Sequence, residues 1–212
     1  MRKNIIYNYF KRGALLMAGL FIMAFGIALS VKSNLGTSPA ASVPYILSMI
    51  LPWSMGQLTF GMQTIFVLIQ ILLLKKDFEL IQLLQLAAAL LFGFFTDITL
   101  SMVSGLEFHN YILQWILCLI SFFFVALGIF LEVKANIVMP SGQGLVKVLA
   151  KIRNSEFSKT KVYYDSTFVI IGAAISLFTF HKLIGIKEGT IAAAVIVGML
   201  VKLMDKAYSF IL

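Results

Sequence analysis

The sequence predicts an all-α membrane protein with six transmembrane helices, arranged as two inverted-topology repeats of three helices each. Three observations predict this fold: long apolar stretches, a segment that occurs twice, and an uneven distribution of Lys and Arg. Hydrophobic residues make up 60% of the 212 residues and charged residues only 12%. A soluble domain carries roughly 25% charged residues. We therefore expect the chain to be integral to a lipid bilayer.

The repeated segment begins at Gly26 and returns at Gly128. GIALSVKSN and GIFLEVKAN are identical at six of nine positions, at an offset of 102 residues. The same order of matches continues downstream, where residues 66–69 align with 168–171, and 85–93 with 190–198. We predict two homologous halves of one membrane domain, residues 1–105 and 106–212.

Three apolar stretches predict the spans of the first half, at about 13–31, 57–74 and 80–103. KSNLGTS interrupts the chain after the first span, and Ser38-Pro39 is typical of a helix start. The helix that follows, 39–50, is about 18 Å long and too short to cross a bilayer.

The second half repeats this plan, with spans predicted at about 111–133, 162–180 and 190–204. A break after the first of these contains Pro140, and a short helix is predicted over 142–152. Two readings of the short helices remain open. Each either re-enters the membrane or lies flat at its surface, and the second reading suits 142–152 because Lys147 and Lys151 share one face.

The basic residues predict the orientation. With both termini in the cytoplasm, fourteen of the seventeen Lys and Arg residues lie on the inner side, and only Lys32, Lys182 and Lys187 lie outside. This asymmetry obeys the positive-inside rule. Because each half has three spans, the second half must be inverted relative to the first.

No pattern typical of catalysis or cofactor binding is present in the sequence. His109 and His181 lie in different halves, without a cluster of cysteines or carboxylates at ligand spacing. We expect no enzyme activity, no metal and no cofactor. The basic residues flank apolar stretches, so we expect lipid rather than nucleic acid as the surrounding partner, and homo-oligomerisation is left open.

The paired breaks are the best functional signal, because non-helical backbone at membrane depth needs burial in protein or a wet cavity. Repeat symmetry would place both breaks about one axis near the midplane. The predicted solute path comprises Asn34, Gly36, Thr37, Ser38, Gln63, Asn136, Ser141, Gly142, Gln143 and Asp165. For Asn34 and Asn136 the alternative role is capping of the preceding helix, since Asn tolerates the left-handed conformation.

Charged residues inside predicted spans or next to them are a second signal, since an intramembrane charge is costly. Asp97, Glu188 and Lys202 are candidates, and Gln63 occupies the repeat position of Asp165. The alternative is that these side chains lie near helix ends and reach the headgroups.

Small residues within the spans indicate close helix packing rather than a site. They include Gly19, Gly26, Gly128, Gly172, Gly198 and the alanine runs 87–89 and 192–194.

The sequence resembles the YczE/YyaS/YitT group of small bacterial membrane proteins. LGTSPAASVPYILS at Leu35, LTFG at Leu58 and GIKEGTIAAA at Gly185 carry the resemblance. It implies a multi-pass protein of the bacterial inner membrane with a role in transport, and it implies no particular solute. In the second half Val138 replaces Gly36, so we expect any pore to be asymmetric.

Together these features predict a transporter or facilitator of a small polar solute or ion. One alternative is the substrate-capture subunit of a multi-component transporter, with Ala14 and Ala18 as part of a docking face. A second alternative is a membrane assembly or regulatory protein that transports nothing.

Overall fold

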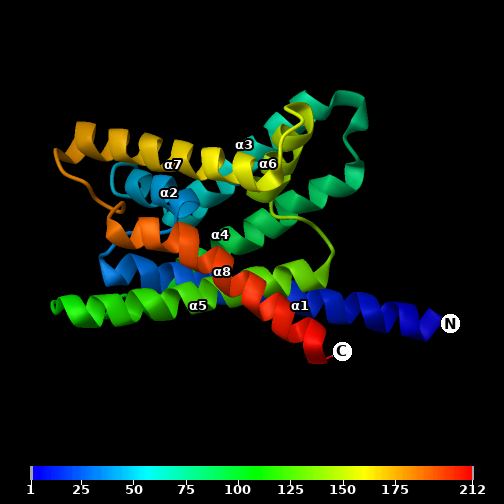
Figure 1. Cartoon of the computed structure of the whole chain (residues 1–212), viewed down its shortest axis with the longest axis horizontal. Helices are drawn as coiled ribbons and strands as arrows, with labels where there is room; N and C mark the ends of the chain where they lie inside the picture. The colour runs from blue at the N-terminus through cyan, green and yellow to red at the C-terminus, as the bar shows by residue number, and fades with distance from the viewer. Residues whose placement is uncertain (1, 212) are drawn as a thin grey trace.

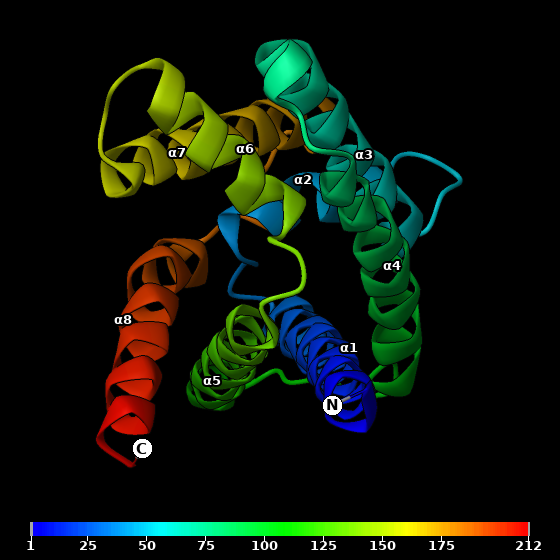
Figure 2. The ribbon, with the colours of Figure 1, turned by 90° about the vertical axis from the view of Figure 1, so that its right-hand side faces the viewer.

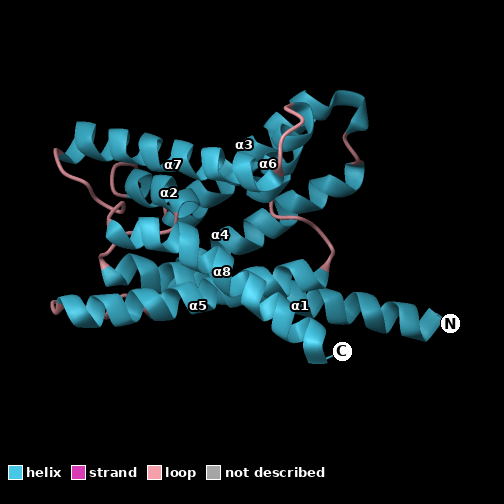
Figure 3. Cartoon of the chain, in the orientation of Figure 1, coloured by secondary structure: helices cyan, strands magenta, loops and turns pink. Residues whose placement is uncertain are grey.

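The computed structural model describes residues 2–211, with side-chain surroundings described for residues 10–209. The described chain forms eight α-helices and no strand (Figures 1 and 3). Their bounds are α1 Arg2–Ser33, α2 Pro39–Ser48, α3 Met55–Leu74, α4 Leu84–Met102, α5 Tyr111–Ala135, α6 Ser141–Ile152, α7 Phe157–Phe180 and α8 Glu188–Ile211.

Five of these segments are long and apolar enough to cross a membrane, so the protein is a multi-pass membrane protein. They are Phe10–Ser33, Met55–Asp77, Leu80–Met102, Tyr111–Ala135 and Phe157–Phe180. The predicted sixth span lies within α8, which has 24 residues and is therefore long enough. α8 is not among the five, since it also contains Glu188, Lys202, Asp205 and Lys206.

The helices extend further than the apolar stretches predict. α1 continues to Ser33, α7 begins at Phe157, and α8 covers the whole of 188–211. The predicted helix 80–103 begins with a short 3₁₀ turn, Leu80–Leu83, before α4. The reason is that hydropathy marks where lipid begins, whereas backbone hydrogen bonding continues through polar residues beyond that boundary.

α1 and α5 lie side by side and antiparallel, and they form the centre of one layer (Figures 1 and 2). Glycines allow their backbones to approach closely. A Cβ on Gly26 would lie 2.7 Å from the Val125 nitrogen, and a Cβ on Gly128 would lie 2.6 Å from the Met23 nitrogen. The predicted packing role of these glycines is confirmed.

The remaining helices lie beside this pair and over one face of it. In the end-on view α4 flanks α1 and α8 flanks α5, while the short helices α2 and α6 lie between α3 and α7 on the opposite side (Figure 2). Gly172 on α7 lies close to Ser42 and Ile46 of α2, as a packing glycine should. Gly198 on α8 is different. A Cβ there would meet nothing within 4 Å, so its predicted packing role is wrong.

Candidate functional site

Two non-helical segments occur where the sequence predicts them; the first is largely buried, and the second is half-buried to exposed. The first break, residues 34–38, connects α1 to α2, and the second break, residues 136–140, connects α5 to α6. Each begins at an Asn in the left-handed conformation, with φ 57° at Asn34 and 46° at Asn136. Both asparagines therefore end a helix in the left-handed conformation, which Asn tolerates better than most residues do.

The first break is held by the loop before α8. The Thr37 amide donates to the Gly185 carbonyl at 3.0 Å, and the Gly189 amide donates to the Leu35 carbonyl at 2.9 Å. The Ser30 hydroxyl donates to the Gly36 carbonyl at 2.9 Å. The two most distinctive motifs of the sequence, LGTSP and GIKEGT, thus hydrogen-bond to each other across the bundle.

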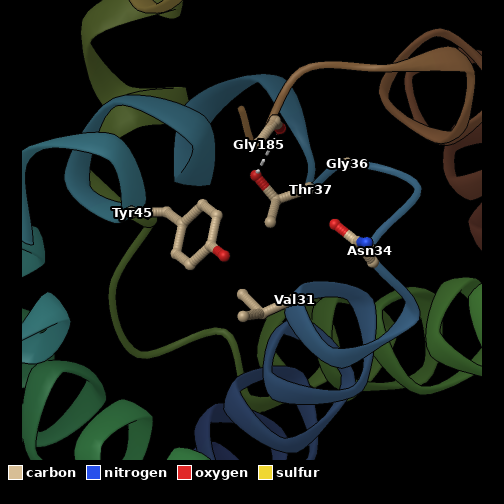
Figure 4. A pocket seen from close by; sticks show the side chains of 6 residues that line it. All are labelled: Val31, Asn34, Gly36, Thr37, Tyr45 and Gly185. Carbon is tan, nitrogen blue, oxygen red and sulfur yellow. Dashed lines mark hydrogen bonds between the residues drawn. The ribbon is translucent and has the colours of Figure 1, made fainter. Parts of the chain in front are cut away.

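Gly36 is required at this junction. Its φ is +102°, and a Cβ would lie 2.3 Å from the Thr190 hydroxyl oxygen. The space left around it is small, since the pocket here has a volume of about 10 Å³. It is lined by Val31, Asn34, Gly36, Thr37, Tyr45 and Gly185 (Figure 4). A volume of this order holds one water at most.

The second break is more open. A cavity of about 160 Å³ lies beside it, lined by Glu132, Val133, Asn136, Ile137, Val138, Met139, Pro140 and Gln143. Its walls are the last turn of α5, the break itself and the first turn of α6.

A buried polar network anchors the start of α6 next to this break. The Ser141 hydroxyl donates to Gln63 Oε1 at 2.9 Å, and Gln70 Nε2 donates to the Ser141 carbonyl at 3.0 Å. Gln70 and Gln85 also exchange hydrogen bonds, at 3.2 and 3.4 Å. α3, α4 and α6 are joined by this network. It satisfies groups that would be costly if left unpaired in the bilayer.

Aromatic side chains fill the space between the two short helices. The ring of Phe66 lies against those of Tyr164 and Phe168, at centroid distances of 5.8 and 5.6 Å. This cluster includes Leu145 of α6, and Ala40 of α2 packs against it. The predicted path between the breaks is therefore packed with side chains in this conformation.

The structure brings only some of the predicted path residues together. Ser141 meets Gln63, and Asn136 and Gln143 share the cavity beside the second break. Gly142 lies in the same turn, against the Tyr164 hydroxyl.

The other path residues are placed elsewhere. The Asn34 carbonyl accepts a hydrogen bond from Lys187 Nζ at 2.8 Å, and Gly36 and Thr37 are buried at the first break. Ser38 is the N-cap residue of α2. Asp165 pairs with Lys161, one turn away on α7.

Two of the three predicted intramembrane charges accept hydrogen bonds, and the third is exposed. Asp97 accepts hydrogen bonds from the Ser54 hydroxyl at 2.6 Å and the Gly56 amide at 2.8 Å, so it caps the start of α3. Glu188 is exposed and accepts from the Tyr111 hydroxyl at 3.2 Å. Lys202 is exposed on α8.

Sequence reasoning missed Glu132. This carboxyl is 2% exposed, it lines the cavity, and its Oε2 has no hydrogen-bond partner among the described residues. A signal was available, since Glu132 is a charged residue inside the predicted span 111–133. Its repeat position is Ser30, and a carboxylate in place of a hydroxyl is a marked change of chemistry.

Comparison with known proteins adds one match. The model of a family of unknown function, DUF6198, matches residues 10–206. No curated protein and no solved structure matches the chain.

Proposed function

The chain belongs to the DUF6198 family, a family of unknown function, and we propose that it moves a small polar solute or ion across the membrane as a secondary transporter or facilitator. One observation carries the proposal. Non-helical backbone at the second break lines a cavity of about 160 Å³ that also contains a buried carboxyl group, Glu132.

Such a site lowers the stability of a membrane protein. Unwound backbone and a carboxyl group inside a membrane protein both forfeit stability unless they are satisfied. A chain selected only to fold would fill the cavity with apolar side chains, as it does at the aromatic cluster around Phe66. Polar groups around an open space therefore support a place where a solute or ion is held.

We further propose the six-span, inverted-repeat architecture, with residues 1–105 and 106–212 as its halves. Contacts between equivalent residues support it. Gly26 approaches Val125 just as Gly128, its equivalent, approaches Met23, the equivalent of Val125. Such reciprocal contacts arise where a two-fold axis passes between two elements.

The helix pairing supports the same proposal. α2 packs on α7 and α6 on α3, while α1 packs on α4 and α5 on α8. Phe66 and Phe168, also equivalent, touch directly. The departure is at α8, where Gly198 is open although its equivalent Gly93 packs on Gly56. The proposed halves thus differ most in their last helices.

We also propose that the chain belongs to the YczE/YyaS/YitT group and lies in the bacterial inner membrane, with both termini in the cytoplasm. The contact between LGTSP and GIKEGT supports the relationship, because the segments that carry the resemblance depend on each other. The start of α1 and the end of α8 lie in the right half of Figure 1, which agrees with an even number of spans.

Cysteine accessibility tests the topology. Cys118 is the only cysteine and is buried, so a Cys118→Ala background gives no competing signal. Ser54→Cys and Asn110→Cys should react with an impermeant maleimide from outside the cell, and Ser155→Cys only from inside. Any other pattern contradicts the six-span topology.

Flux measurements test the function. A thermal-shift screen of amino acids, sugars, carboxylic acids and inorganic salts identifies a ligand, and the purified protein in liposomes is then assayed for its uptake. We expect uptake without any partner protein. Binding without uptake would instead indicate a capture subunit, and a folded protein with neither would indicate an assembly or regulatory role.

A further inference from the structure

Glu132 lies in the last turn of α5, next to the second break. The residue is 2% exposed, and it is one of the residues that line the cavity of about 160 Å³. Oε2 is buried without a hydrogen-bond donor in the described part of the chain. Such a group needs either a proton or a positively charged ligand, because an ionised carboxylate alone in a low-dielectric interior is very costly.

The surrounding basic residues do not neutralise it. Within the described residues no Lys or Arg nitrogen lies within 4.0 Å of Glu132. Lys134, on the same helix, pairs with Asp205 of α8 at 2.7 Å and lies over the Tyr208 ring. Among the other charged groups described on helices that contact α5, Lys11 and Arg12 on α1 and Glu188, Lys202 and Lys206 on α8 are exposed. Lys32 on α1 is half-buried and donates to the Ser104 carbonyl at 2.6 Å.

The cavity offers oxygen ligands. Asn136 and Gln143 line it with Glu132, and both have amide oxygens. Asn136, with φ 46°, ends α5, so the last carbonyls of that helix lack intrahelical partners and present the negative end of its dipole. Carboxylate, amide and carbonyl oxygens are the ligands that hard cations prefer.

The charge at the site selects the valence of the cation. Glu132 is the only acidic residue that lines the cavity, and the described residues hold no cluster of three metal-ligating side chains. One carboxylate balances one positive charge. The volume exceeds the ~30 Å³ that a single water occupies in the liquid, so a cation fits with part of its hydration shell.

The first break shows why there is one such site rather than two. At the position of Glu132 it has Ser30, whose hydroxyl donates to the Gly36 carbonyl and helps close the junction. An ionised carboxylate cannot donate in this way. The exchange of Ser for Glu therefore removes one closing hydrogen bond from the second break and supplies a carboxyl group to it.

We propose that Glu132 and the cavity beside the second break bind a monovalent inorganic cation, with a proton as the competing occupant. This cation would be the coupling ion of transport, and that role rests on the proposed function. Its binding, however, is measurable in detergent without any flux.

Carbodiimide labelling tests the site, with Na⁺ as the probe. Dicyclohexylcarbodiimide reacts with protonated carboxyl groups in apolar surroundings, and peptide mass spectrometry locates the adduct. We expect modification of Glu132 in choline chloride and protection by NaCl at equal ionic strength. At a Na⁺ concentration about ten times Kd the rate should fall about tenfold, because only the unoccupied site reacts.

Two variants control the labelling. Glu132→Gln should lose the adduct, whereas Asp97→Asn, which changes a carboxyl already held by two donors, should keep both the adduct and its protection by NaCl. If pH alone governs the rate and Na⁺, Li⁺ and K⁺ do not change it, the site is protonated only and the cation proposal is wrong.

A thermal-shift measurement gives an independent readout, since the buried thiol of Cys118 reports unfolding to a thiol-reactive dye. NaCl should raise the melting temperature of the wild type relative to choline chloride, and Glu132→Gln should show no such rise. Glu132→Gln itself should fold, because it removes a buried charge.

Absence of both protection and stabilisation in folded wild type overturns the cation site, even if a solute is transported. Protection without solute flux leaves the site standing and contradicts the proposed function instead.

Discussion

Gly128→Ala should destabilise the protein, because this glycine lies where α1 and α5 cross. An added Cβ would lie 2.5 Å from the Met23 Cβ, 2.6 Å from the Met23 nitrogen and 2.7 Å from the Gly19 carbonyl oxygen. Ordinary contacts begin at 3.4 Å. The two helices must therefore separate by roughly 1 Å, and two of the three obstructing atoms are backbone, which cannot rotate away.

The magnitude follows from two opposing terms. Overpacking of this kind costs up to about 3 kcal/mol, and replacing a helical Gly by Ala returns about 1 kcal/mol of helix propensity. The net loss is about 2 kcal/mol, which corresponds to a fall in melting temperature of roughly 4–8 °C for a chain of this size.

The melting temperature can be measured in detergent through Cys118, which is 0% exposed and reacts with a thiol-reactive dye only on unfolding. Gly198→Ala is the matched control. Its Cβ meets nothing within 4 Å, so it should match or slightly exceed the wild-type melting temperature. If Gly128→Ala melts as high as Gly198→Ala, the close crossing of α1 and α5 is wrong.

Three further substitutions test the polar contacts. Asp97→Asn should lower stability by about 1–2 kcal/mol, because the amide cannot accept from both Ser54 and the following backbone; an unchanged melting temperature would remove its capping role. Gln70→Leu and Gln85→Leu should each cost about 1–3 kcal/mol by removing the hydrogen bonds between the two amides, while the double variant should cost less than the sum; additive losses would show that the pair is not coupled. Asn34→Gly should change stability by less than about 0.5 kcal/mol and keep solute flux, since its side chain accepts one long hydrogen bond within the described chain, from Lys187 at 3.4 Å; lost flux in a folded variant would place the solute at the first break.

Much of the fold was predictable from residue type and spacing. Long apolar stretches identified the five membrane-spanning segments, because a bilayer selects side chains by hydropathy over about 20 residues. Ser38-Pro39 and Pro140 marked the starts of the short helices within a residue or two. Gly26 and Gly128 were recognised as packing residues, since glycine in a membrane helix is informative without knowledge of the partner helix.

The sequence also marked where the breaks lie, but tertiary structure decided what each of them contacts. Thr37 pairs with Gly185, 148 residues away, and Ser141 with Gln63, 78 residues away. Hydropathy within a segment carries no information about such partners, because the choice depends on which helices become neighbours after insertion.

Glu132 shows the same limit of what a sequence determines. The sequence by itself established that a carboxylate lies in an apolar helix and that its repeat position is a serine. Only the packing decided that Asp97 finds two donors while Glu132 faces a cavity with Oε2 unpaired within the described chain. The energy of a buried charge is set by the atoms within a few ångströms of it. For Asp97 these atoms come from residues 41 and 43 positions away, a pairing that only the packing of α3 on α4 decides.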